Sequence, residues 1–336
     1  MRGVGFLKRQ LRRAWPFGSG PRPVILMYHR VAELDSDPWQ LAVSPRHFEA
    51  HLEHLRRSRT PMDLAAFVAA LTAGTLPRDA VALTFDDGYV DNLHQAEPRL
   101  AAAGIPATLF LTTAAIGRPE PFWWDELAHL ILDRSAPADL SVGIADGRYR
   151  LQFGEPDRLD LDRRRWRAWE RPRTAREAAY QALWRLIRDA SRPERERAMA
   201  TLRRALGGAG AASEEERAMT PDEVRGMARR GVVTLGGHTL SHPALPTLTP
   251  AEQRWEIAEG KRAAEEMSGQ RVEGFAYPYG AMDASAQAAV AACGFAWACS
   301  TVATAVGAAD FQRYALPRIA APNAGKAVLA RALGDG

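Results

Sequence analysis

Short apolar runs alternate with amphipathic helical segments along most of this 336-residue chain, and this alternation restricts the fold more than any other feature. Continuous apolar runs predict buried strands over residues 23–31, 81–85, 107–112, 232–235, 274–277 and 295–300. Strands that alternate with helices predict an α/β fold with a mostly parallel sheet, either open or closed into a barrel.

Helix start signals agree with this pattern. Ser44 before Pro45 opens a helix whose inward stripe is Phe48, Leu52 and Leu55. Further helices are expected after the cap Asp63, over 92–103, after Thr220 with Glu223, after Thr249 with Glu252, and over 283–292.

The alternation breaks between about residues 117 and 219. Residues 163–204 carry 14 arginines and five acidic residues, in mostly helix-forming sequence, and residues 207–212 have the composition of a flexible link. We therefore expect one domain over residues 22–336, interrupted by an Arg-rich helical insertion at about 117–219. A basic leader over residues 1–21 precedes it.

The net charge of +4 is unevenly distributed. Residues 1–22 carry six Lys/Arg and no acid, and the chain outside this leader and the Arg-rich segment is acidic. This distribution argues against a nucleic-acid-binding core, in which a basic stripe runs along the folded face. It fits an anionic partner, such as a membrane surface or a phosphorylated substrate.

Residues 4–17 have the pattern of a short helix lying on an anionic membrane. Apolar residues recur at helical spacing largely opposite basic ones: Val4, Leu7, Leu11 and Trp15 against Lys8, Arg9, Arg12 and Arg13. A solvated leader is the alternative. Because the apolar run and cleavage site of a secretory signal are missing, we expect a cytoplasmic protein, in contact with the inner face of the membrane if the leader binds it.

Two other sequence features indicate ordinary structural roles rather than a membrane span or a metal site. Residues 284–309 carry no charge, but their Ala-rich composition and Gly294 predict a buried helix–strand pair rather than a membrane span. Cys293 and Cys299 form neither a zinc signature nor a disulfide framework, so we expect a reducing compartment.

Polar side chains gather where predicted strands end, which is where α/β sheets and barrels place their chemistry. These residues are His29, Asp86, Asp87, His238, His242 and Tyr279. Adjacent carboxylates in a half-buried place need a cation, and two histidines four residues apart can converge on one ion. With one carboxylate they form a three-ligand set that leaves positions open for water and substrate.

A second histidine group, His47, His51 and His54, also has a plausible ligand spacing. It flanks the apolar stripe of a charged helix and has no carboxylate or glycine loop beside it. We interpret it as a solvated helix face.

The strand-end motifs resemble those of the polysaccharide deacetylase family, carbohydrate esterase family 4, with its NodB homology domain. Thr-Phe-Asp-Asp-Gly stands at 84–88, His-Thr-Leu-Ser-His-Pro at 238–243, and a partial third motif, Ala-Tyr-Pro-Tyr-Gly, at 276–280. The resemblance covers about residues 22–116 and 220–322. It implies a distorted, partly open (β/α)7-type barrel and a divalent metal, commonly zinc.

Carried over residue by residue, the resemblance implies Asp87, His238 and His242 as metal ligands and Asp86 as general base. It places the Tyr279 backbone N–H in the oxyanion hole. The chain departs from the family at two points, because Ala276 replaces the arginine that tethers the base, and no histidine follows His242 to supply the general acid. Arg318 is our candidate substitute for the arginine. The proton donor is either His29 or the protonated Asp86, and a structural role for His29 stays open.

We therefore expect a metal-dependent hydrolase that removes N-acetyl groups from an amino-sugar glycan or from a lipid-linked or nucleotide-linked sugar precursor. The alternatives are an amidohydrolase acting on a non-sugar amide and a glycan-binding protein without turnover. Phe122, Trp123 and Trp124 either stack on sugar rings or pack onto the barrel.

Overall fold

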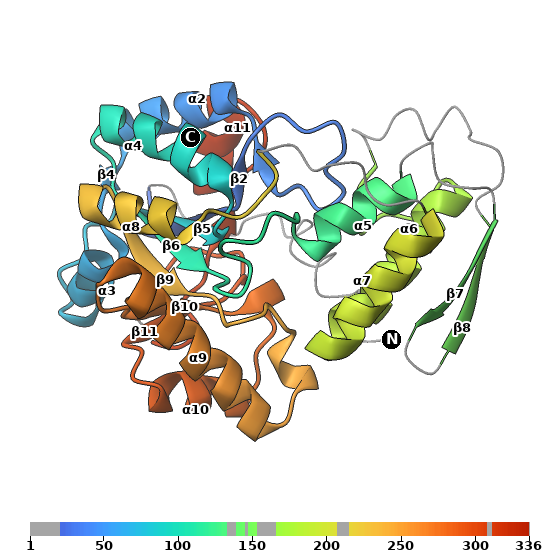
Figure 1. Ribbon diagram of the computed structural model, residues 1–336. Helices are drawn as coiled ribbons and strands as arrows, with labels where there is room; N and C mark the ends of the chain where they lie inside the picture. Colours follow the sequence, from blue (N-terminus) through green and yellow to red (C-terminus); the bar gives the residue numbers. More distant parts are fainter. Residues whose placement is uncertain are drawn as a thin grey trace. The chain divides into compact units, whose positions relative to one another are not determined.

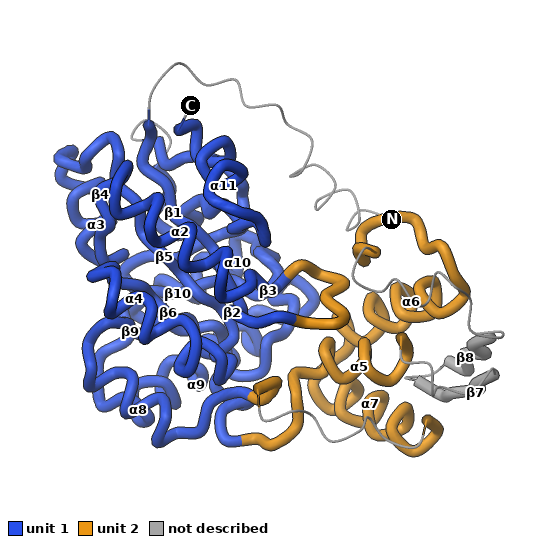
Figure 2. The backbone as a smooth tube through the Cα atoms, turned by 90° about the horizontal axis from the view of Figure 1, so that it is seen from above, with its two compact units in different colours: residues 1–33, 41–117, 218–336 blue, residues 34–40, 118–217 orange. Residues whose placement is uncertain are grey.

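The computed structural model describes residues 21–132, 139–144, 147–152, 166–206, 215–307 and 311–335. The chain forms two compact units (Figure 1, Figure 2). Unit 1 comprises residues 1–33, 41–117 and 218–336, and unit 2 comprises residues 34–40 and 118–217. The predicted membrane-binding pattern at 4–17 and the link at 207–212 lie outside the described residues.

Unit 1 is built on a parallel eight-stranded sheet. Its strands are β1 (Val24–Tyr28), β4 (Thr60–Pro61), β5 (Ala80–Asp87), β6 (Ala107–Leu111), β9 (Val233–Gly237), β10 (Gly274–Ala276), β11 (Trp297–Cys299) and β12 (Ile319–Ala320). They follow the order β11-β10-β9-β6-β5-β1-β12, with β4 paired to β5. A parallel bridge between Cys299 and Leu316 connects β11 to the segment before β12, so the sheet curls toward closure. The predicted distorted, partly open (β/α)7-type barrel is confirmed.

Helices surround this sheet (Figure 1). They are α2 (Pro45–Ser58), α3 (Leu64–Thr72), α4 (Glu97–Ala103), α8 (Pro221–Arg230), α9 (Pro250–Ser268), α10 (Ala284–Ala292) and α11 (Lys326–Leu333). The predicted start signals are confirmed: Ser44 and Asp63 cap α2 and α3, while Thr220 and Thr249 form capping boxes at α8 and α9.

The strands bury both faces, because alternate side chains point into the barrel or toward the helices. The inner cluster contains Ile25, Ala82, Phe110 and Trp297. At Gly274, a Cβ would lie 2.0 Å from the Trp297 ring, so this strand needs a glycine to let the indole fill the interior. The barrel is therefore a packed core below the residues at its rim.

The structure corrects the predicted first strand, which does not run through residues 23–31. The chain leaves the main sheet after Tyr28, and β2 (Arg30–Val31) pairs with β3 (Ala42–Val43) in a separate two-stranded sheet. Apolar composition cannot reveal this break, because buried Asp91 draws the chain aside by accepting hydrogen bonds from Arg30 and Val31.

Unit 2 contains α5 (Trp123–Leu132), α6 (Ala175–Asp189) and α7 (Arg192–Leu206), together with an antiparallel pair, β7 (Asp139–Ile144) and β8 (Gly147–Gln152). The sequence did not predict this strand pair. Segment 34–40 belongs to unit 2 because Trp39 packs against Trp184 and donates a hydrogen bond to the Tyr180 hydroxyl. None of the described helices is long and apolar enough to cross a membrane.

Candidate metal centre

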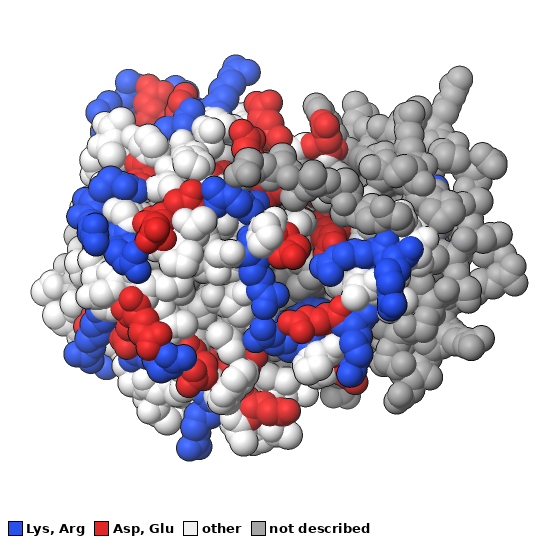
Figure 3. Space-filling view, viewed as in Figure 1, with Lys and Arg blue, Asp and Glu red and all other residues white. Residues whose placement is uncertain are grey.

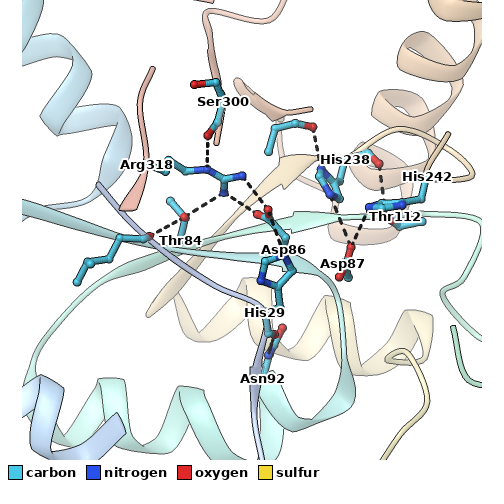
Figure 4. Close-up of polar contacts among 12 residues, drawn as sticks. His29, Thr84, Asp86, Asp87, Asn92, Thr112, His238, His242, Ser300 and Arg318 are labelled. Atoms are coloured by element: carbon cyan, nitrogen blue, oxygen red, sulfur yellow. Dashed lines mark hydrogen bonds and ion pairs between the residues drawn. The ribbon is translucent and has the colours of Figure 1, made fainter. Parts of the chain in front are cut away.

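The six strand-end residues predicted from the sequence follow or end strands at one end of the barrel of unit 1. Figure 4 shows His29, Asp86, Asp87, His238 and His242 near one another. Asp86 and Asp87 are the last residues of β5, which runs two residues further than predicted. The residue after Tyr28 of β1 is His29, and His238 follows Gly237 of β9. In a parallel sheet these carboxyl ends share one rim, so residues far apart in sequence become neighbours.

Asp87, His238 and His242 form the tightest group. The Asp87 Oδ1 atom lies 3.6 Å from His238 Nε2 and 3.4 Å from His242 Nε2, and all three side chains are buried. These distances exceed those of ordinary N–H···O hydrogen bonds, about 2.7–3.2 Å. Two ligand atoms each about 2.1 Å from a shared tetrahedral ion are about 3.4 Å apart. The group therefore fits the first ligands of a divalent cation.

Backbone contacts orient both imidazoles. The Nδ1 atom of His238 lies 2.7 Å from the Ala276 carbonyl oxygen, so it donates the proton and turns Nε2 toward Asp87. The backbone N–H of His242 donates to Thr239 Oγ1 over 2.9 Å. Sequence reasoning missed the role of Ala276, since a main-chain carbonyl carries no signal in the residue type.

The loop 238–242 is also held from α9. Glu256 accepts hydrogen bonds from the Ser241 backbone N–H at 2.8 Å and from its hydroxyl at 2.6 Å. At Gly260 a Cβ would lie 2.5 Å from the backbone of Thr239, so only glycine lets the helix approach the loop this closely. Neither residue was singled out from the sequence, because both contribute to the site only through tertiary packing.

Left-handed backbone concentrates in this site. Five non-glycine residues in the described chain have positive φ, and four of them are Asp87 (79°), Thr239 (66°), His242 (59°) and Tyr279 (59°). For β-branched Thr239 this conformation is particularly unfavourable. Residues in such conformations each cost about 1–3 kcal/mol and cluster where function requires them.

Asp86 is held by Arg318. The guanidinium donates from Nη1 to Oδ1 and from Nη2 to Oδ2, both at 2.7 Å, and neither side chain is more than 3% exposed. Arg318 also donates to the Ser300 carbonyl oxygen and to Thr84 Oγ1. It precedes β12 rather than ending a strand as predicted, and its side chain reaches Asp86 (Figure 4).

The charges around Asp86 keep its carboxyl ionised. Burial raises its pKa, but the nearby Arg318 charge, His238 and the hydrogen bonds from Arg318 outweigh burial and lower the pKa to about 2. The bidentate contact with Arg318 therefore holds Asp86 as an ionised carboxylate in one fixed orientation.

His29, the residue that follows β1, faces Asp86. Its Nε2 atom lies 3.9 Å from Asp86 Oδ2, and its side chain is 21% exposed. Burial is the main cause that lowers its pKa to about 4, with Asp86 opposing the shift. The His29 imidazole therefore lies beside Asp86, the candidate general base, and is still partly exposed to solvent.

Tyr279 lies in the turn Pro278–Gly280 after β10. Its ring packs edge-on against that of His242, with centroids 4.5 Å apart. The turn requires glycine at position 280, where φ is +64° and a Cβ would clash with Thr301. This close packing places residue 279 beside a metal-ligand candidate.

The second histidine group does not form a solvated face, and that prediction is wrong for His51. His51 is fully buried, with Nδ1 3.2 Å from the Tyr28 hydroxyl and Nε2 2.7 Å from the Ala324 carbonyl oxygen. His47 contacts Asn323 and His54 contacts Asp335. These partners come from the C-terminal segment, more than 270 residues away, which helical periodicity cannot predict.

The aromatic residues of unit 2 pack together. Phe122 and Trp124 are buried and stack with centroids 4.8 Å apart, while Trp123 contacts Trp124 and Trp184. This packing within unit 2 accounts for these rings without a sugar.

Comparisons with known proteins agree with the motifs. The sequence model of a family described as "Polysaccharide deacetylase" matches residues 73–135 and 203–298. "Putative polysaccharide deacetylase YxkH" of Bacillus subtilis (strain 168) is 37% identical over 98 residues, which are 28% of this chain and 33% of that protein. The match thus spans about a third of that relative's length.

Solved structures share the fold at low identity. Streptococcus pyogenes deacetylase PplD, in complex with acetate, has a TM-score of 0.59 at 17% identity, covering 94% of this chain and 99% of the other. IcaB from Ammonifex degensii has a TM-score of 0.54 at 17% identity, covering 90% and 93%. Members of this family hydrolyse carbon–nitrogen bonds other than peptide bonds. The strand-end motifs, the match to the family's sequence model and the shared barrel all point to the same resemblance, to the polysaccharide deacetylase family.

Proposed function

We propose that this protein is a metal-dependent N-deacetylase acting on an amino-sugar unit of a glycan or glycan precursor. The observation that carries the proposal is the close approach of Asp87, His238 and His242 beside the Arg318-clamped Asp86. Metal-assisted amide hydrolysis uses a bound ion together with a base that takes the proton of the attacking water, and these residues offer candidates for both parts.

Asp87, His238 and His242 would hold the divalent ion. When bound, such an ion polarises an amide carbonyl and makes water a better nucleophile near neutral pH. A set of two imidazoles and one carboxylate is typical of catalytic zinc sites, and zinc is our proposal for the ion.

Asp86 would accept the proton of the attacking water. Arg318 would keep its carboxylate in place, so the base does not have to be ordered when substrate binds. The backbone N–H of Tyr279 would stabilise the negative charge that develops on the carbonyl oxygen. The loss of one such donor costs about 2.7–4 kcal/mol of transition-state stabilisation.

His29 would pass to the leaving amine the proton that Asp86 takes from the attacking water, because the partly buried imidazole itself is neutral near pH 7. Its location beside Asp86, with partial exposure, supports this role over a purely structural one. Protonation matters because an unprotonated amine is a poor leaving group, and a positioned acid contributes about 10²–10⁴-fold to rate.

Acetate release tests the proposal. Purified protein loaded with Zn²⁺ should release acetate from N-acetylglucosamine oligomers, and Asp87→Ala should lose both bound zinc and turnover. Asp86→Asn should retain the metal but lose turnover, which separates the base from the ligands. Release from small non-sugar N-acyl compounds alone would favour the amidohydrolase alternative. Glycan binding without acetate release across the panel would favour a protein without turnover.

We also propose a cytoplasmic location at the inner membrane face, with a lipid-linked or nucleotide-linked precursor as substrate. The basic amphipathic pattern of residues 4–17 supports this proposal. The full chain should sediment with anionic phospholipid vesicles in low salt, and Arg12→Glu with Arg13→Glu should weaken this binding several-fold. Equal sedimentation of both proteins would contradict membrane contact through the leader.

A further inference from the structure

His29 lies at a break between strands, where the regular ladder no longer holds the backbone. β1 ends at Tyr28, and β2 begins at Arg30 in a different sheet. The ring is also partly exposed. A side chain at such a position needs other contacts to keep one orientation.

Those contacts come from the segment that follows the two catalytic-site aspartates. Asn92 Nδ2 donates to the His29 carbonyl oxygen at 2.8 Å and to Asp91 Oδ1 at 3.1 Å. Asp91 also accepts hydrogen bonds from the Val31 backbone N–H at 3.0 Å and from Arg30 Nε at 2.8 Å. The main chain is therefore held at residues 29 and 31, on both sides of the Arg30 side chain.

Aromatic packing completes the network. The guanidinium carbon of Arg30 lies 4.5 Å from the centroid of the Tyr89 ring. Arg30, Tyr89, Asp91 and Asn92 are all buried. Because residues 89–92 follow Asp86-Asp87-Gly88 directly, the network connects His29 to the segment just after the end of β5, which carries both carboxylates.

Stability alone is a poor explanation for this network. Burying an arginine and an aspartate costs several kcal/mol per ion, and apolar side chains of similar size often replace such pairs without loss of stability. The buried Asn92 Oδ1 atom has no hydrogen-bond partner among the described residues, so the side chain of Asn92 bonds through Nδ2 alone in this part of the chain. A π-helical turn, Asn92–Ala96, begins at the same residue, and such turns are frequent at functional sites.

We infer that Asn92 and Asp91 are positioning residues that hold the His29 imidazole opposite Asp86 for proton donation to the leaving group. This inference rests on the proposed function. Asn92 acts on the His29 carbonyl directly, and Asp91 acts through Arg30 and Val31.

Leaving-group dependence tests the inference. An aryl acetate ester expels a phenolate that needs no proton, whereas an N-acetyl sugar expels an amine that does. With Zn²⁺-loaded full-length protein, His29→Ala should lower kcat on N-acetylglucosamine oligomers by at least about 100-fold, and Asn92→Ala should lower it by about 10–100-fold. Both should hydrolyse 4-nitrophenyl acetate within about threefold of wild type. Asp91→Asn, which keeps the side-chain shape, should show the same split.

Two controls separate positioning from folding. The double variant His29→Ala with Asn92→Ala should be no slower on the amide than His29→Ala, because Asn92 acts through His29. Asn323→Ala removes a matched asparagine that accepts from the Ser44 backbone N–H at 3.0 Å, and it should leave both activities unchanged.

Each failure has its own signature. Equal losses on amide and ester, or additive losses in the double variant, would overturn the positioning role. A loss in His29→Ala with none in Asn92→Ala would do the same while leaving the proposed function intact. A wild-type protein inactive on every N-acetyl sugar, with zinc bound, would instead reject the proposed function.

Discussion

Arg318 is the side chain whose loss should disturb the site most without removing a metal ligand. Its guanidinium satisfies both oxygens of buried Asp86 and also reaches Thr84 and the Ser300 carbonyl (Figure 4). Arg318→Met keeps much of the apolar length but removes every donor. Asp86 would then remain buried without its main counter-charge.

The free energy of unfolding should fall by about 3–5 kcal/mol in Arg318→Met, the usual cost of removing one partner of a buried pair. Most of this cost is the stranded carboxylate rather than the lost attraction. The double variant Asp86→Asn with Arg318→Met should therefore recover much of the loss. The coupling between the two positions should reach at least about 2 kcal/mol.

Urea unfolding at pH 7 measures these differences through the transition midpoint at constant slope. Arg262→Met is a matched control on α9, since this arginine is 57% exposed and pairs with Glu259 and Glu266 on the helix surface. It should cost less than about 1 kcal/mol. On N-acetylglucosamine oligomers, kcat of Arg318→Met should fall about 100-fold, because the Asp86 carboxylate is no longer held in position to accept the proton of the attacking water.

Two results would refute this reasoning. One is an Arg318→Met protein as stable as the Arg262→Met control. The other is a double variant whose loss equals the sum of the two single losses, which would mean that Asp86 and Arg318 are energetically independent despite their bidentate contact.

Three further predictions concern the metal, the buried histidine and the α9 contact. Zn²⁺ should raise the melting temperature of the wild type but not of Asp87→Ala, and a chelator should reverse the wild-type shift; no shift in the wild type would contradict a cation site. Burial lowers the pKa of His51 to about 4 from 6.5, with neighbouring His47 and His54 adding to this effect, so the unfolded chain binds more protons between these pH values and acid destabilises the fold. His51→Gln should therefore lose about 2 kcal/mol less than wild type between pH 7 and pH 5 in urea unfolding; parallel pH curves would contradict this. Gly260→Ala should force the 238–242 loop to shift and weaken zinc binding at least about tenfold in a competition titration with a chromogenic chelator, and unchanged affinity would show that the loop tolerates the added methyl group.

Local signals in the sequence predicted the alternating elements well. Capping residues such as Ser44 and Thr220 act within one helical turn, and apolar runs report burial directly, so both are readable without tertiary contacts. The sequence also pointed to Asp86, Asp87, His238 and His242, because parallel strands bring their carboxyl ends to one rim whatever lies between them. The family resemblance assigned roles that spacing alone left open.

Only the tertiary structure decided which distant groups meet. Arg318 contacts Asp86 across 232 residues, and His51 is buried because the segment around Ala324 covers it. The break after Tyr28 likewise follows from Asp91, 60 residues away from Val31. Such contacts depend on how strands register and helices dock, and those are set by the packing of the whole core rather than by any short stretch of chain.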